Sequence, residues 1–215
     1  MKQAVQNENP ERFNRLAAEW DQNPGRVALA RAVAVAVRAA IPLEPTMRVL
    51  DFGAGTGLIT LTLQDAVREV VAVDSSPEML NVLQRKLDRA GLTNVKTLLL
   101  DIEQAPFPES GFDLLVSAMT LHHLRDPRLA FERFSQALRP NGLLAIADLD
   151  SEEGDFHADK TGVHHFGFDR ERLIRDLSEC GFHNFRSQTV HRIVRSDTAG
   201  QPRNFTVFLI TASRI

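Results

Sequence analysis

Five short apolar runs recur along the first two thirds of the chain, separated by segments in which apolar residues follow a helical spacing. The runs are continuous rather than alternating, which is typical of strands buried on both faces of a sheet. Parallel neighbours need long crossover connections, so strands alternating with helices predict a mostly parallel sheet. The runs are MRVLD at 47–51, VVAVD at 70–74, VKTLLLD at 95–101, FDLLVSA at 112–118 and GLLAIAD at 142–148.

The segments between the runs carry helix start and stop signals. Ser-Pro and Asp-Pro pairs precede helices predicted at 77–91 and 127–139, and an aspartate cap begins one predicted at 169–181. Upstream, apolar residues at helical spacing predict a core-packing helix at 25–41. A weaker pattern predicts a helix at 11–20.

The pattern changes near the end of the chain, where the runs at 182–194 and 204–212 have no helix between them. A polar turn containing Gly200 and Pro202 separates the two, which indicates a hairpin and a final antiparallel strand. We therefore predict a Rossmann-like α/β three-layer sandwich, with a mostly parallel seven-stranded sheet ending in an antiparallel strand. The length suits one domain over 1–215.

Composition narrows the class of protein. The chain holds 25 Lys and Arg against 28 Asp and Glu, a formal net charge of -3, one Trp and no Tyr. Neither a bulk positive field nor many base-stacking rings are available, which disfavours a nucleic-acid partner. The lone Cys180 and an amino terminus without the apolar core of a secretory signal favour a cytoplasmic protein. No apolar stretch approaches the roughly 20 residues of a membrane span.

Four of the five runs end in aspartate, at Asp51, Asp74, Asp101 and Asp148. In an open parallel sheet, ligands bind outside the carboxyl ends of the strands. Aspartate also terminates strands as an ordinary cap or turn residue. The repetition at one edge nevertheless predicts a shared site there.

The first strand runs directly into a glycine-rich turn, DFGAGTG at 51–57. Glycine allows a tight turn and lets a ligand lie against the backbone, and the amides opening a following helix can hold an anionic group. Leu58 stands where a dinucleotide fingerprint has its third glycine, and no Lys followed by Ser or Thr completes a phosphate loop. Asp74, 21 positions beyond Gly53, can accept two hydrogen bonds from a ribose diol.

Taken in order over about 47–149, four stretches resemble the motifs of class I S-adenosylmethionine-dependent methyltransferases. They are VLDFGAGTGLIT, VVAVDSSPEML, LLLDIEQAPFPESGFDLLVSAMTLHHL and LRPNGLLAIAD. The nearest likeness is to the stand-alone bacterial small-molecule type, similar to quinone-biosynthesis methyltransferases. The resemblance implies methyl transfer from S-adenosylmethionine to a small-molecule acceptor.

The resemblance also implies cofactor-binding roles. The turn at 53–57 would meet the methionine portion, with Asp51 near its amino group. Asp74 would take the ribose hydroxyls, and Asp101 the adenine amino group. RFNRLAAEWD resembles a cofactor-covering helix that would place Phe13 and Trp20 over the ligand, although both rings also suit ordinary packing. The full cofactor set is Trp20, Asp51, Gly53, Ala54, Gly55, Thr56, Gly57, Asp74, Ser75, Met79, Asp101, Ile102, Ser117 and Ala118.

Beyond the fifth strand the resemblance fades. The polar stretch at 150–168 is long enough to predict a flap over the acceptor. It would follow N-terminal cap helices at 1–46 and a cofactor-binding core at 47–149, and precede a final helix and hairpin at 169–215.

Histidines supply the candidate catalytic residues, namely His122, His123 and His165, and His164 is also placed to reach an acceptor. A neutral imidazole can take a proton from a hydroxyl or amine, and each of these residues also suits packing. Adjacent helical residues point about 100° apart, so we expect only one of His122 and His123 to face the ligand. No His pair at i, i+4 spacing occurs, and we predict no metal site.

Two alternatives stay open. A nicotinamide-dependent oxidoreductase would use a similar fold, although the early third glycine argues against it. A non-catalytic S-adenosylmethionine-binding protein would carry the same motifs without turnover. The motifs name neither the acceptor nor the atom that is methylated.

Overall fold

Seven strands form one sheet in the order β3-β2-β1-β4-β5-β7-β6 in the computed structural model, which describes residues 8–196 and 201–215. Strands β1 to β5 pair in parallel, and β7 runs antiparallel to both β5 and β6. The predicted fold class is confirmed. The strands are β1 Arg48–Phe52, β2 Glu69–Asp74, β3 Val95–Leu99, β4 Phe112–Ala118, β5 Leu138–Leu149, β6 Phe182–Ser196 and β7 Pro202–Arg214.

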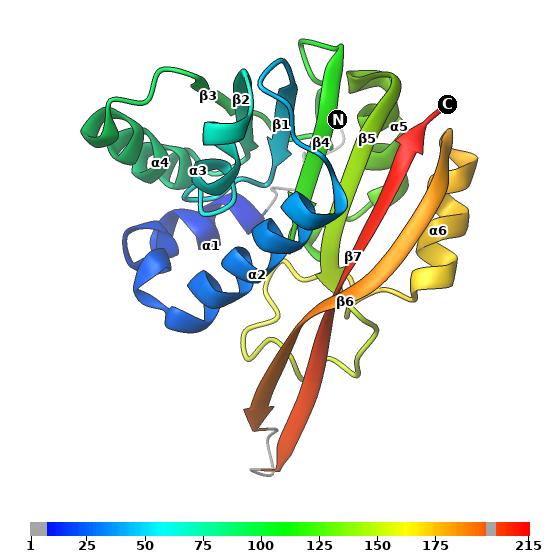
Figure 1. The fold of residues 1–215 in the computed structure, drawn as a ribbon. Helices are drawn as coiled ribbons and strands as arrows, with labels where there is room; N and C mark the ends of the chain where they lie inside the picture. The colour runs from blue at the N-terminus through cyan, green and yellow to red at the C-terminus, as the bar shows by residue number, and fades with distance from the viewer. Residues whose placement is uncertain (1–7, 197–200) are drawn as a thin grey trace, which may run out of the picture.

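Helices cover both faces of the sheet (Figure 1). One buried cluster joins the sheet to α2 and α4, and a second joins its other face to α5 and α6. The α-helices are α1 Glu8–Leu16, α2 Pro24–Ala40, α3 Thr60–Leu63, α4 Pro77–Ala90, α5 Pro127–Ala137 and α6 Arg170–Glu179. The 3-10 helices are η1 Ala17–Gln22, η2 Gln64–Ala66 and η3 Leu121–His123.

The predicted caps explain where three helices begin. Ser76, Asp126 and Asp169 each accept a hydrogen bond from the backbone amide three residues later, at 3.2, 3.2 and 2.8 Å. Each bond satisfies an amide that the first helical turn leaves without a partner. At the far end of α4, Gly91 adopts φ +65°, a left-handed cap.

One local expectation was wrong. The helix predicted at 11–20 is divided, because α1 ends at Leu16 and η1 continues in a tighter 3-10 form. The helix that follows the glycine turn, α3, begins only at Thr60 and has four residues. Glycines with positive φ throughout the turn cannot continue a right-handed helix.

The carboxyl ends of β1, β2, β4 and β5 share one edge of the sheet, and three other parts of the chain gather there. Figure 1 shows the blue N-terminal helices and the yellow 150–168 segment at this edge, with the distal half of the β6–β7 hairpin extending beyond it. An isolated bridge between Asp150 and Phe168 joins the two ends of the yellow segment. Residues 1–7, and the predicted turn at Gly200, lie outside the described residues.

Over 8–196 and 201–215, no helix combines the length and apolar character that crossing a membrane requires.

Candidate active site

A cavity of about 1050 Å³ occupies the carboxyl edge of the sheet. Its walls come from the strand ends, α1, η1, α2, the 150–168 segment and β6. All of the predicted cofactor-binding residues line it except Gly57 and Ser117. Residues predicted from separate motifs therefore converge on one space.

The three glycines of the turn at 53–57 all have positive φ but face different surroundings. Gly53, Gly55 and Gly57 adopt φ +74°, +56° and +82°. A Cβ on Gly55 would have only the Met79 sulfur nearby, at 4.0 Å, because this glycine borders the cavity. A Cβ on Gly57 would lie 2.3 Å from Leu83 Cδ1, inside the packing against α4. Gly55 thus leaves room for a ligand, whereas Gly57 leaves room for a helix.

Two acidic side chains lie beside this turn. Thr60 Oγ1 donates to Asp51 Oδ2 at 2.5 Å, and the amides of Gly55 and Ser76 donate to the two oxygens of Asp74, both at 2.8 Å. Burial raises the pKa of Asp51 to about 6; the Thr60 hydrogen bond opposes this rise and the charge of Asp74 adds to it. Burial also raises the pKa of Asp74, against the amide hydrogen bonds.

Neither carboxylate pairs with a cationic side chain of the described residues. Such an arrangement fits a ligand that brings its own positive charge, because a cation would compensate two desolvated carboxylates. Asp101 lines the same cavity, and its Oδ1 accepts from the Glu103 amide at 2.9 Å.

The fourth strand-end acid, Asp148, lies outside the cavity and holds a histidine. Asp148 Oδ1 lies 2.6 Å from His122 Nδ1 and also accepts from the Leu149 amide at 2.8 Å. Both side chains are buried, with 0% and 1% exposed. A carboxylate only accepts hydrogen bonds, so Nδ1 donates in this bond, and Nε2 is the atom that accepts in the neutral ring. Nε2 has no protein partner among the described residues, and His122 lines the cavity.

The neighbouring His123 has another role. Its Nδ1 donates to the Gly162 carbonyl at 2.8 Å, and its ring contacts Phe13 edge-on at 5.0 Å between centroids. Burial and the nearby His122 hold the pKa of His123 well below its ordinary value. A neutral His123 therefore ties the 150–168 segment to α1 and η3.

The histidines of the 150–168 segment are divided between two locations. His157 lines the cavity with its ring centroid 5.0 Å from that of His122, and burial followed by His122 lowers its pKa to about 3. The ring of His165 instead packs near Phe168, at 5.3 Å, and does not line the cavity. The amides of His164 and His165 donate to the His122 carbonyl at 2.9 and 3.1 Å.

Polar contacts fasten the N-terminal helices over the turn. The Ser76 hydroxyl donates to Asn14 Oδ1 at 2.7 Å, which connects α1 to the start of α4. The Thr56 hydroxyl donates to Asp21 Oδ1 at 2.6 Å, and Lys86 Nζ lies 2.5 Å from Asp21 Oδ2. Because Thr56 belongs to the glycine turn, η1 is held directly against the site.

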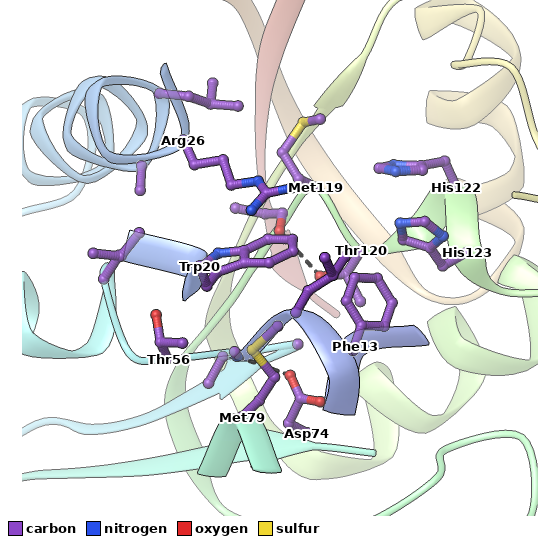
Figure 2. Close-up of a pocket in the computed structure, with 18 of the residues that line it drawn as sticks. Phe13, Trp20, Arg26, Thr56, Asp74, Met79, Met119, Thr120, His122 and His123 are labelled. Atoms are coloured by element: carbon purple, nitrogen blue, oxygen red, sulfur yellow. Dashed lines mark hydrogen bonds between the residues drawn. The ribbon is translucent and has the colours of Figure 1, made fainter. Parts of the chain in front are cut away.

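Figure 2 shows Phe13 and Trp20 over the turn, with the Arg26 guanidinium above the indole. The rings of Phe13 and Trp20 meet edge-on at 5.7 Å, and Arg26 Cζ lies 3.9 Å from the Trp20 ring centroid. Both rings line the cavity. Sequence reasoning gave no cofactor-binding or catalytic role to Asn14, Asp21, Arg26, His157 and Arg195, although Asn14 and Asp21 lie within the stretch RFNRLAAEWD.

Among residues 8–196 and 201–215, no group of three or more His, Cys, Asp or Glu side chains is placed to hold a metal ion.

The sequence profile of a methyltransferase-domain family matches residues 50–146, a range that contains the glycine turn, Asp74, Asp101 and His122. This part of the chain is a methyltransferase domain of the class I S-adenosylmethionine-dependent family. S-adenosylmethionine as the cofactor of this family, and the family itself, were predicted from the motifs and are confirmed. The chain shares 31% identity over 154 residues with the uncharacterized methyltransferase C1347.09 of Schizosaccharomyces pombe, covering 64% of this chain and 54% of that one.

A second relative is the uncharacterized methyltransferase YcgJ of Bacillus subtilis, 33% identical over 101 residues, which cover 47% of this chain and 40% of the relative. The chain thus spans about half the length of the curated relatives it matches. The crystal structure of YcgJ aligns with a TM-score of 0.70 over 86% of this chain and 98% of that one, at 19% identity. A second crystal structure, of a SAM dependent methyltransferase from Aquifex aeolicus, aligns with a TM-score of 0.67 over 96% of this chain and 98% of that one, at 24% sequence identity. These structural likenesses concern the fold.

Proposed function

We propose that this chain transfers the methyl group of S-adenosylmethionine to a hydroxyl or amine of a small-molecule acceptor. The observation that carries the proposal is one continuous cavity, which is lined by an acidic glycine turn and by His122 of a buried His-Asp pair. The turn suits a cationic nucleoside, and the histidine would serve as the proton acceptor.

The cofactor end is assigned residue by residue. Asp51 and the turn at 53–57 would hold the methionine amino group, with the Ala118 carbonyl nearby. Asp74 would accept the ribose hydroxyls in place of its present amide donors, and Met79 would lie against the ribose or adenine. Asp101 and the Ile102 amide would meet the adenine edge. With this assignment, the positive charge of the methionine amino group would compensate the carboxylates of Asp51 and Asp74.

When bound, the cofactor supplies a sulfonium methyl group, which leaves a neutral thioether after transfer. His122 Nε2 would accept the proton that the acceptor hydroxyl or amine loses as its oxygen or nitrogen bonds to the methyl carbon. Asp148 would hold the ring in the required tautomer and stabilise the imidazolium that forms. The protein's other contribution is alignment and exclusion of water, through Phe13 and Trp20.

A small acceptor is favoured because three further segments line the cavity around the strand ends. α1 lies over it from the N-terminal segment at 1–46, residues 156–159 reach it from the flap at 150–168, and β6 contributes from 169–215. With the core at 47–149, these segments would act as one domain around one site.

Ligand binding provides the test. We expect S-adenosylhomocysteine, but not NAD, to raise the melting temperature, and Asp74→Ala to weaken S-adenosylhomocysteine binding at least tenfold. Asp88→Ala, on the exposed side of α4, is the matched control. Stabilisation by NAD alone would favour a nicotinamide-dependent oxidoreductase instead. If S-adenosylmethionine binds but no S-adenosylhomocysteine is produced with any acceptor of a hydroxyl and amine panel, the chain would be a non-catalytic binding protein.

The proposed base is tested by His122→Asn, which keeps a donor toward Asp148 and removes Nε2. We expect kcat to fall by about 10²- to 10⁴-fold, the usual contribution of a general base, while the Kd for the cofactor changes less than threefold. His165→Asn, outside the cavity, serves as the control. Turnover of His122→Asn at the wild-type rate would exclude His122.

A further inference from the structure

The cavity is lined by charges of both signs. Asp51, Asp74 and Asp101 lie at the strand ends, and the remaining walls carry five arginines and a single acid, Asp159. The arginines are Arg12, Arg15, Arg26, Arg192 and Arg195. Since the chain as a whole has a net charge of -3, this positive wall is a local arrangement rather than a consequence of composition.

Two of these arginines are held in the same way. Arg26 Cζ lies 3.9 Å from the Trp20 ring centroid, and Arg195 Cζ lies 3.9 Å from that of Phe156. Stacking on an aromatic face fixes the guanidinium plane and leaves its in-plane N–H groups available as a fork. Arg195 uses one of them on the Phe156 carbonyl.

Neither Arg26 nor Arg195 forms an ion pair with a carboxylate of the described residues. Burial lowers the pKa of Arg26, and the charge of Arg12 adds to that effect. Burial and then the charge of Arg26 lower the pKa of Arg195. Helix α2 and strand β6 pack against each other, so the two guanidinium groups reach the cavity from neighbouring elements, and an anion bound there would offset their positive charges.

The surroundings of this pair are suited to a small organic molecule. Leu29, Val33 and Ile193 line the same part of the cavity wall from α2 and β6. Arg195 also acts electrostatically on His157, whose ring lies next to His122. An anion held by the arginines would therefore lie on the same side of the cavity as the proposed base.

We propose that the methyl acceptor is a small organic acid with an apolar body, and that Arg26 and Arg195 bind its anionic group. This inference rests on the proposed function, since it names the class of acceptor for the same site. The volume of about 1050 Å³ lies at the upper end of the range for small-molecule pockets, and leaves space for an acid beside the cofactor.

The test uses the full chain saturated with S-adenosylhomocysteine. The carboxylate of S-adenosylhomocysteine then already occupies its own site, and added benzoate does not compete for that site. Benzoate and its neutral isostere benzamide are titrated by calorimetry at constant ionic strength. Trp20 is the one tryptophan of the chain, and its emission reports binding beneath Arg26. We expect saturable benzoate binding at least tenfold tighter than benzamide binding, and a tenfold or greater loss in Arg195→Gln and Arg26→Gln.

Arg31→Gln provides the matched control, because Arg31 is exposed on the same helix as Arg26 and does not line the cavity. Equal binding of benzoate and benzamide, or no benzoate binding to the saturated wild type, overturns the acid acceptor. A loss of S-adenosylhomocysteine affinity in both variants with benzoate binding retained also overturns it, since the arginines would then serve the cofactor. Failure of S-adenosylhomocysteine to bind the wild type would overturn the proposed function instead.

Discussion

Gly55 and Gly57 lie two residues apart in the turn, and their surroundings in the structure differ. Both have positive φ, so alanine is strained at either position. Only Gly57 would also drive its new methyl group into Leu83. Their sequence context is nearly the same, and the difference comes from what lies opposite each Cα.

We predict that Gly57→Ala lowers the free energy of unfolding by about 2 to 4 kcal/mol, from strain and overpacking together. Gly55→Ala should cost about 1 kcal/mol but weaken S-adenosylhomocysteine binding at least tenfold, because the methyl group enters the cavity. Urea unfolding and calorimetry measure the two effects. Equal stability losses with unchanged affinity would contradict this division of roles.

A second residue-scale prediction concerns Asp51. Its pKa rises from 3.8 to about 6 in the folded protein, so its contribution to folding stability decreases as pH rises between those values. A ligand ammonium group favours the ionised form. We therefore expect S-adenosylhomocysteine affinity to fall as pH drops below about 6, by up to about tenfold per pH unit.

Asp51→Asn should bind more weakly at pH 7.5 and lose the part of the pH dependence due to Asp51. Calorimetric titrations between pH 5 and 7.5 compare it with the wild type. Wild-type affinity that stays constant over this range would argue against an amino group at Asp51.

Among the elements, α1 depends most on its contacts. A nine-residue helix is marginal in isolation, and Asn14 fixes it by accepting from the Ser76 hydroxyl and the Glu78 amide, at 2.7 and 3.2 Å. We predict that Asn14→Ala weakens S-adenosylhomocysteine binding three- to tenfold, speeds its release, and shifts the melting temperature by less than 2 °C. Stopped-flow fluorescence of Trp20 provides the measurement.

The control for this variant is Glu11→Ala, an exposed change on the same helix. Unchanged release from Asn14→Ala would mean that α1 packs at the edge without covering the ligand.

At the scale of elements, the sequence predicted the helices that carry their own caps. Ser76 and Asp126 act within their own helices, so a local pattern identifies α4 and α5. The division between α1 and η1 had no such signal. It follows from contacts of Asp21 with Thr56 and Lys86, which are 35 residues and more away in sequence.

In the whole molecule, the cavity joins segments that are far apart along the chain. We predict that S-adenosylhomocysteine slows amide hydrogen exchange in 11–26, 53–57, 74–79 and 154–162, and leaves 170–179 unchanged. Contact with one ligand would suppress local opening of all four segments together. Protection confined to 53–57 would show that the N-terminal helices and the 150–168 segment do not close over the ligand.

The same long-range arrangement limits what the sequence could predict about catalysis. His122, His123 and His165 were all candidates, because residue type and place along the chain were the available criteria. The structure separates them: His122 bonds Asp148 from β5, His123 bonds Gly162, and the ring of His165 packs near Phe168. Asp148 was predicted at a shared ligand edge, but it lies behind the histidine instead.

By itself, the sequence determined the order of strands and helices, the glycine turn and the acids at the strand ends. These are local properties, since apolar periodicity, caps and positive φ depend on neighbours along the chain. The tertiary structure decided which acid holds a histidine, which glycine borders the ligand space, and that arginines from α2 and β6 line the same cavity. Those outcomes depend on the packing of segments that share no local signal.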